Sequence, residues 1–223
     1  KIVIVHEGVD VERMVRLPAA NVHAQFYLPT HAPVIGNVAA LVPQKGQHHL
    51  IDAAALVVRE VPDARFVIFG EGELRNALEK QIKDGHLERH VFLAGFRADA
   101  FELTKGCDLF VMSSLHEGLC TAIVDAMAAS KAVVATSVGG VPEVVVDGNT
   151  GFLVEPRDHR AMARALVRLL PDEPLRNTMG EAGLQRAREL FTVERMVQET
   201  AAVYERLVGT RRAAGTASPS AAG

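Results

Sequence analysis

The sequence is poor in cysteine and has no strong excess of charge. Only Cys107 and Cys120 occur among its 223 residues, too few for a disulfide framework, so we interpret them as small residues in a reduced compartment. The formal net charge is −3, with both signs mixed along the chain. This balance argues against a nucleic-acid-binding surface, which would be basic.

Targeting and membrane signals are also missing. The chain has neither an 18-residue apolar run nor the basic start and apolar core of a signal peptide. We therefore expect a soluble, cytoplasmic protein. The chain begins at Lys1, within the strand-like run KIVIV, which favours a fragment whose preceding part is absent.

Metal-binding patterns are lacking as well. Nine histidines are scattered, and neither His48-His49 nor His116 has the spacing of metal ligands. No Asp-x-Asp motif follows a strand. The sequence predicts no metal and no bound cofactor.

Short apolar runs alternate with helical patterns along most of the chain. The expected strands are 2–5, 34–41, 64–69, 91–95, 109–112, 132–135 and 151–154. Such alternation predicts parallel βαβ units, and hence an α/β fold with a Rossmann-like doubly wound sheet of about six strands. We divide the chain into a leading strand and connector (1–33), a Rossmann-like domain (34–172), C-terminal helices (173–209) and a disordered tail (210–223).

The most informative stretch runs from Cys107 to Ala129. A buried strand leads through a polar turn at Glu117-Gly118 into a helix, and ligands of open α/β sheets bind at such strand ends. The free N–H groups of the helix start favour an anion. Glu117 and Asp125 would lie roughly 12 Å apart and point roughly 80° apart on a helix. They therefore suit two parts of one long ligand, and not the two sides of a single glycosidic bond.

This stretch resembles the E-x7-E signature of retaining glycosyltransferases of the GT-B fold, in the large GT4-like group. Asp125 takes the place of the second glutamate. The segments Gly139–Glu143 and Asp147–Gly151 resemble the family's G-G-x-P-E and D-G-x-x-G motifs. The resemblance covers about residues 1–208 and implies the donor-binding, C-terminal half of such an enzyme.

The resemblance also implies roles for individual residues. Glu117 would bind hydroxyls of the donor sugar and Asp125 those of the ribose, since carboxylates accept from both O–H groups of a diol. Lys45 and the helix-start amides would hold the diphosphate, and Phe96-Arg97 would lie at the base. Ala40 stands where the family commonly has a second, arginine contact to the diphosphate. Either Arg97, another group or the absent domain replaces that contact, or donor binding is weak.

These considerations give one set of candidate residues. We assign catalysis to Glu117 and Lys45, and donor binding to Gly72, Phe96, Arg97, Gly118, Leu119, Cys120, Thr121 and Asp125. The expected donor is a UDP-, GDP- or ADP-sugar, and the acceptor would be bound by the absent N-terminal domain. We expect no nucleic-acid partner, and peripheral membrane association of the full-length enzyme.

Other interpretations stay open at this point. A non-catalytic or regulatory nucleotide-sugar-binding domain would be consistent with Ala40 and Asp125. Another GT-B enzyme, such as a nucleotide-sugar epimerase or a phosphorylase, would share the fold. An NAD-dependent oxidoreductase fits less well, because Arg75 occupies the place of the third glycine in the dinucleotide-binding fingerprint.

Overall fold

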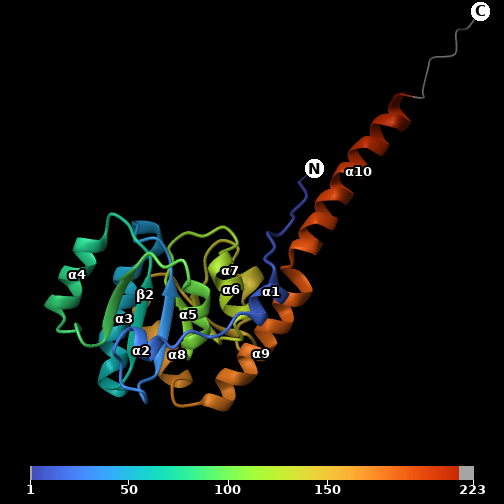
Figure 1. The fold of residues 1–223 in the computed structure, drawn as a ribbon. Helices are drawn as coiled ribbons and strands as arrows, with labels where there is room; N and C mark the ends of the chain where they lie inside the picture. Colours follow the sequence, from blue (N-terminus) through green and yellow to red (C-terminus); the bar gives the residue numbers. More distant parts are fainter. Residues whose placement is uncertain (1, 216–223) are drawn as a thin grey trace, which may run out of the picture.

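Six parallel strands form one sheet in the order β3-β2-β1-β4-β5-β6 (Figure 1). The computed structural model describes residues 2–215, with side chains for residues 2–208. The strands are β1 (Val34–Val38), β2 (Arg65–Phe69), β3 (Val91–Gly95), β4 (Leu109–Met112), β5 (Val133–Thr136) and β6 (Gly151–Val154). The expected α/β class and doubly wound sheet are confirmed.

Helices cover both faces of the sheet because successive strand residues point to opposite sides. Ile35 and Leu109 pack in one layer, and Phe110 packs in the other. The first layer contains α3 (Gln47–Glu60), α4 (Arg75–Asp84) and α8 (His159–Leu169). The second contains α1 (Val11–Arg16), α2 (Val22–Gln25), α5 (Ala100–Gly106), α6 (Thr121–Ala128), α7 (Val141–Val144) and α9 (Glu173–Leu190).

The strand order reverses between β1 and β4, which pair side by side at the centre of the sheet. From β1 the chain continues outward to β2, whereas from β4 it continues outward to β5 on the other side. The loops after β1 and β4 therefore diverge and leave a crevice at their carboxyl ends. The helix start that the sequence predicted to be an anion site lies at this switch point.

The N-terminal segment differs from the expectation. Residues 2–5 form no strand, because no described strand lies beside them to accept and donate the ladder hydrogen bonds. The connector contains two short helices, α1 and α2, capped by Asp10 and Asn21. The predicted leading strand is thus wrong. The division into domains stays a prediction.

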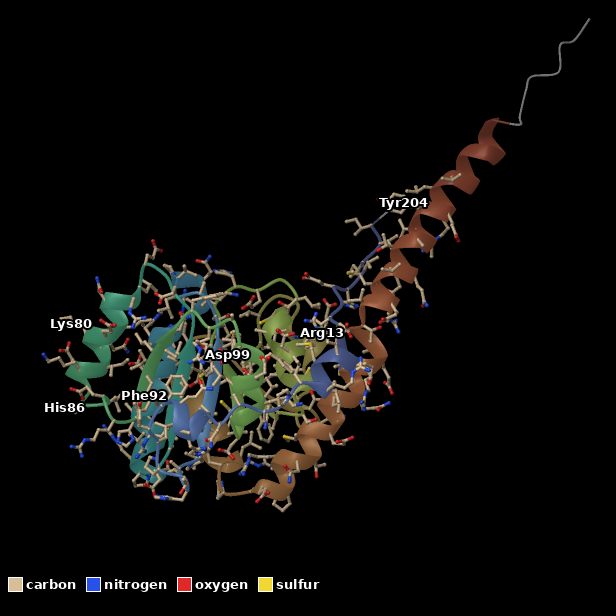
Figure 2. All side chains as sticks on the ribbon, viewed as in Figure 1. Arg13, Lys80, His86, Phe92, Asp99 and Tyr204 are labelled. Atoms are coloured by element: carbon tan, nitrogen blue, oxygen red, sulfur yellow. The ribbon has the colours of Figure 1, made fainter. Side chains whose placement is uncertain are left out.

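The C-terminal helix α10 (Val193–Gly215) is longer than expected and extends away from the body (Figure 1). Disorder from residue 210 is therefore wrong for 210–215, where arginine and alanine favour a helix. Residues 216–223 of the predicted tail lie outside the described residues. Tyr204 stands on the projecting part with 67% of its surface exposed (Figure 2).

The described helices include none that is long and apolar enough to cross a membrane. The cytoplasmic location stays a prediction.

Candidate functional site

The loops after β1 and β4 are bonded together at the switch point. The hydroxyl of Ser113 donates to the carbonyl of Lys45 (3.0 Å), and the amide of Leu115 donates to the carbonyl of Gln44 (2.7 Å). Gly46 has a φ of +62°, and a Cβ there would lie 2.4 Å from the carbonyl oxygen of Ser113. Glycine at this position therefore allows the two loops to touch.

Lys45 and Glu117 meet across this contact. The Lys45 Nζ lies 2.7 Å from Oε1 of Glu117, and the Ser114 hydroxyl donates to the same oxygen at 2.6 Å. The Glu117 side chain is only 7% exposed and that of Lys45 is 25% exposed. Neither bond uses Oε2 of Glu117, and an ammonium has three N–H donors. Both residues thus keep polar atoms for a ligand while holding each other in place.

Helix α6 begins beside Glu117 without a side-chain cap. Its N-cap, Cys120, has a φ of +66° and makes no capping hydrogen bond. No hydrogen bond from the amides of Leu119, Cys120 or Thr121 is found within the described part of the chain. A non-glycine residue in this left-handed conformation is typically strained and is common at functional sites. The helix start is therefore a positively polarised set of donors, suited to an anion.

A third loop, after β5, supports the backbone of Glu117 and Gly118. The amide of Gly140 donates to the carbonyl of Gly118 at 2.8 Å. Gly139 has a φ of +52°, and a Cβ there would lie 1.9 Å from the carbonyl oxygen of Glu117. The glycine pair thus borders the polar turn.

A cavity of about 310 Å³ opens beyond the carboxyl ends of β1, β2 and β3. Its walls are Val38, Ala39, Ala40, Phe69, Gly70, Glu71, Phe96, Arg97 and Ala100. Phe96 is 76% exposed, so its ring is accessible for stacking. Gly72 is not part of these walls, and a Cβ there would lie 2.3 Å from the carbonyl oxygen of Leu41.

The guanidinium of Arg97 is already engaged. It makes two hydrogen bonds to Asp99, at 2.8 and 2.7 Å, and a further one to Gln25. The bonds from Arg97 hold the pKa of Asp99 below its usual value. Arg97 therefore borders the cavity as half of an ion pair, and it is a poor replacement for the arginine missing at Ala40.

Asp125 lines a smaller hollow beside this cavity. The hollow has a volume of about 30 Å³ and shares Val38 and Ala100 with the larger one. Burial among apolar groups raises the pKa of Asp125 to about 6. No hydrogen bond or ion pair to its carboxylate is found among the described residues. It is a half-buried acceptor without a protein partner, lying one turn into α6.

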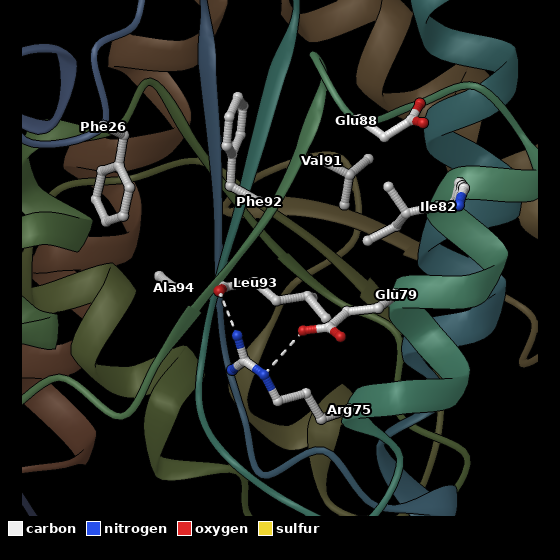
Figure 3. Close-up of a pocket in the computed structure, with 10 residues that line it drawn as sticks. Phe26, Arg75, Glu79, Ile82, Glu88, Val91, Phe92, Leu93 and Ala94 are labelled. Carbon is white, nitrogen blue, oxygen red and sulfur yellow. Dashed lines mark hydrogen bonds and ion pairs between the residues drawn. The ribbon is translucent and has the colours of Figure 1, made fainter.

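A further hollow of about 460 Å³ runs along the edge strand β3 (Figure 3). Its lining is mostly apolar, but it includes Glu79 and Glu88, and Arg75 there bonds to Glu79 and to the Leu93 carbonyl. The charges of its lining cancel, because Arg75 and Lys83 stand against the two carboxylates, and Arg75 is already paired with Glu79. The hollow therefore does not compete with the helix start of α6 as an anion site.

A model of the family described as glycosyl transferases group 1 matches residues 20–186. The chain belongs to this family. An uncharacterized glycosyltransferase of Methanocaldococcus jannaschii is 34% identical over 172 residues, which are 76% of this chain and 47% of that protein. The chain spans about half or less of the length of these curated relatives, for example 47%, 42% and 40% of three of them.

Solved structures of related chains agree with this assignment. The crystal structure of Anabaena HepE in complex with UDP-glucose superposes with a TM-score of 0.81 at 29% identity, covering 93% of this chain and 57% of that one. The C-terminal domain of a glycosyl transferase group 1 family protein from Francisella tularensis has a TM-score of 0.73 at 29% identity, covering 83% of this chain and 100% of that one. The predicted glycosyltransferase family and GT-B type of fold are confirmed.

The structure brings most of the predicted site residues together and adds others. Lys45, Glu117, Gly118 and the α6 amides share one edge of the sheet. Sequence reasoning missed the role of Ser114, whose bond to Glu117 depends on the conformation of the turn. Gly70 and Glu71, from the same strand-end turn as the predicted Gly72, are walls of the cavity.

Proposed function

We propose that this chain is the donor-binding half of a retaining glycosyltransferase that uses a nucleotide diphosphate sugar. The observation that carries the proposal is the Lys45–Glu117 pair at the uncapped start of α6. There, one cation and several free amides can receive a diphosphate, and one carboxylate oxygen remains for a sugar hydroxyl.

The order of the other groups supports the same ligand. The cavity beside Phe96 is large enough for a base, the hollow at Asp125 comes next, and the helix start and Glu117 follow. A base, a ribose, a diphosphate and a sugar are joined in this sequence in a nucleotide sugar. We therefore assign the base to Phe96, the ribose to Asp125, the diphosphate to Lys45 with the α6 amides, and the sugar to Glu117.

The chemistry that these residues can perform is stabilisation of the leaving group. Negative charge accumulates on the diphosphate as the bond to the sugar breaks, and fixed donors aimed at that charge lower the barrier. Lys45 supplies a full charge and α6 supplies oriented dipoles. The acceptor would be bound by another part of the whole protein, and transfer with retained anomeric configuration is part of the proposal.

Calorimetric titration of this chain with UDP, GDP and ADP, and then with their glucose conjugates, tests the donor role. One nucleotide should bind in preference, Lys45→Ala should weaken it, and Glu117→Gln should weaken mainly the sugar conjugate. Lys80→Ala is the control, because Lys80 lies on exposed α4 (Figure 2). Absence of binding by all three at millimolar concentration would contradict the proposal.

The stereochemical part needs the full-length enzyme. An α-linked donor should give an α-linked product, identified by the anomeric proton coupling in NMR, whereas a β-linked product would show inversion.

A second candidate is a domain that binds the nucleotide sugar without catalysing transfer. It is favoured by the alanine at position 40 and by the pairing of Arg97 with Asp99, which leave Lys45 as the one cation expected at the diphosphate. Full-length enzyme that binds donor but releases neither nucleotide nor product would support it.

A further inference from the structure

A cluster of metal-ligating side chains lies where α3 and α8 begin. His49 and Asp52 stand on one face of α3, and His159 is the first residue of α8. Each offers one ligand atom, and the three atoms lie within 4.8 Å of one another. The two helices pack against each other, so the cluster lies at a helix–helix contact, with all three residues partly buried.

The polar surroundings hold these ligands in a coordinating arrangement. The amide of Gln81 on α4 donates to Oδ1 of Asp52 at 2.8 Å and also to the carbonyl of His48. One carboxylate oxygen of Asp52 is thus fixed, and the other remains for an ion. Outer hydrogen bonds of this kind orient the carboxylate and the histidines of metal sites.

His49 carries an unused polar atom. Its Nδ1 is buried and makes no hydrogen bond to any described group. A buried nitrogen without a partner costs free energy, which coordination at that nitrogen would recover.

We propose that His49, Asp52 and His159 form a binding site for Zn²⁺ or a similar transition-metal dication. Two imidazoles and one carboxylate suit Zn²⁺, whereas Mg²⁺ and Ca²⁺ prefer sets made entirely of oxygen. In a tetrahedral site with bonds of about 2.0–2.1 Å, ligand atoms stand roughly 3.3 Å apart, so a contraction from the present spacing is sufficient. Water or a ligand would complete the fourth position.

The ion would join the first turns of α3 and α8. The amide of His49 bonds to the carbonyl of Gly46, which directly follows Lys45. The site would therefore stiffen the start of α3, which follows Lys45 after Gly46, while it takes no part in the transfer chemistry. The inference does not depend on the proposed function. The sequence predicted no metal because the third ligand follows the last strand, far from the other two.

Titration of the untagged chain with Zn²⁺ after treatment with EDTA tests the site. One ion per chain should bind, and Co²⁺ in its place should give visible d–d absorption, while Mg²⁺ and Ca²⁺ should not compete. At free Zn²⁺ about 100 times Kd, the thermal midpoint should rise by roughly 5–10 °C.

Variants locate the ion. His159→Ala and Asp52→Asn should each abolish the stoichiometric binding, and Gln81→Met should weaken it by about 10–100-fold. His31→Ala, with an exposed histidine outside the cluster, should bind as the parent does. No binding, or equal binding by folded His159→Ala and the parent, would overturn the inference. Asp52→Asn decides the matter if His159→Ala does not fold.

Discussion

Lys45 and Glu117, which come from loops after two different strands, are joined by an ion pair of 2.7 Å at the centre of the sheet edge. Each residue fixes the other in the orientation that a donor would meet. Because the two side chains are already ordered, they lose less conformational entropy when a ligand binds, which is the basis of pre-organisation. It also makes the two side chains energetically coupled.

Loss of the lysine should affect both stability and donor binding. Lys45→Ala leaves Glu117 93% buried beside the Ser114 hydroxyl and the Cys120 thiol, without a cation, and should lower the free energy of unfolding by about 1–3 kcal/mol. Nucleotide affinity should fall about 10–100-fold, because a charge-assisted hydrogen bond to phosphate is lost. Urea unfolding and calorimetry measure the two effects. Lys80→Ala, at an exposed pair with Asp84, should change neither, and equal effects in both variants would contradict the assignment.

Asp125 should make stability and donor binding depend on pH in opposite senses. Its pKa is raised to about 6 in the folded chain, against about 3.9 when unfolded, so the folded state binds more protons between these values. The contribution of Asp125 to the free energy of unfolding is therefore fully present below about pH 4, and it is lost as the pH rises to about 6. Asp125→Asn should raise the free energy of unfolding at pH 7.5, by at most about 2–3 kcal/mol.

The same group should favour nucleotide binding at higher pH, since the carboxylate accepts from both ribose hydroxyls. Affinity should fall as the pH drops below about 6, and Asp125→Asn should flatten this profile. A pH profile that is identical in parent and variant would remove Asp125 from the site.

An arginine at position 40 tests how the diphosphate is neutralised. Ala40 lines the cavity, and Arg97 is held by Asp99, so a new guanidinium would meet a site with one cation. Ala40→Arg should tighten nucleotide diphosphate binding by about tenfold or more, which corresponds to one charged hydrogen bond. Ala40→Gln, similar in length but uncharged, is the matched control. Unchanged affinity in Ala40→Arg would mean that this position does not face the diphosphate.

Gly139 tests the support of the polar turn. Gly139→Ala adds a strained φ and a Cβ at 1.9 Å from the Glu117 carbonyl, so the turn must shift. Gly148→Ala is the control, because its φ is +75° but no atom lies within 4 Å of the new Cβ. Both should pay the backbone strain of about 1 kcal/mol, whereas only Gly139→Ala should lose further stability and donor affinity. Equal thermal midpoints and affinities would contradict the close packing of these loops.

Much of the fold could be predicted from periodicity and strand-end residues. The apolar runs at 91–95, 109–112 and 151–154 coincide with β3, β4 and β6, because parallel strands buried on both faces are continuously apolar. The prediction of a strand at residues 2–5 was wrong, since a strand requires a neighbouring strand, which the local sequence cannot supply. The end of α10 was predicted too early, because small residues such as those near its end are typical of both helices and disordered tails.

Within the site, the sequence placed Lys45, Glu117 and the α6 amides at one edge, because strand ends of a parallel sheet converge there. It did not predict that Lys45 and Glu117 bind each other, nor that Asp99 engages Arg97. Such pairings depend on loop conformation and side-chain rotamers, which no motif specifies.

The central claim is that a diphosphate lies at the start of α6. Hydrogen–deuterium exchange of this chain, with and without saturating nucleotide diphosphate, tests it directly. The amides of Gly118, Leu119, Cys120 and Thr121, which have no acceptor among the described residues, should exchange markedly more slowly in the complex. Protection along β3 and α4, around the hollow of Figure 3, with no change at 118–121, would contradict the account.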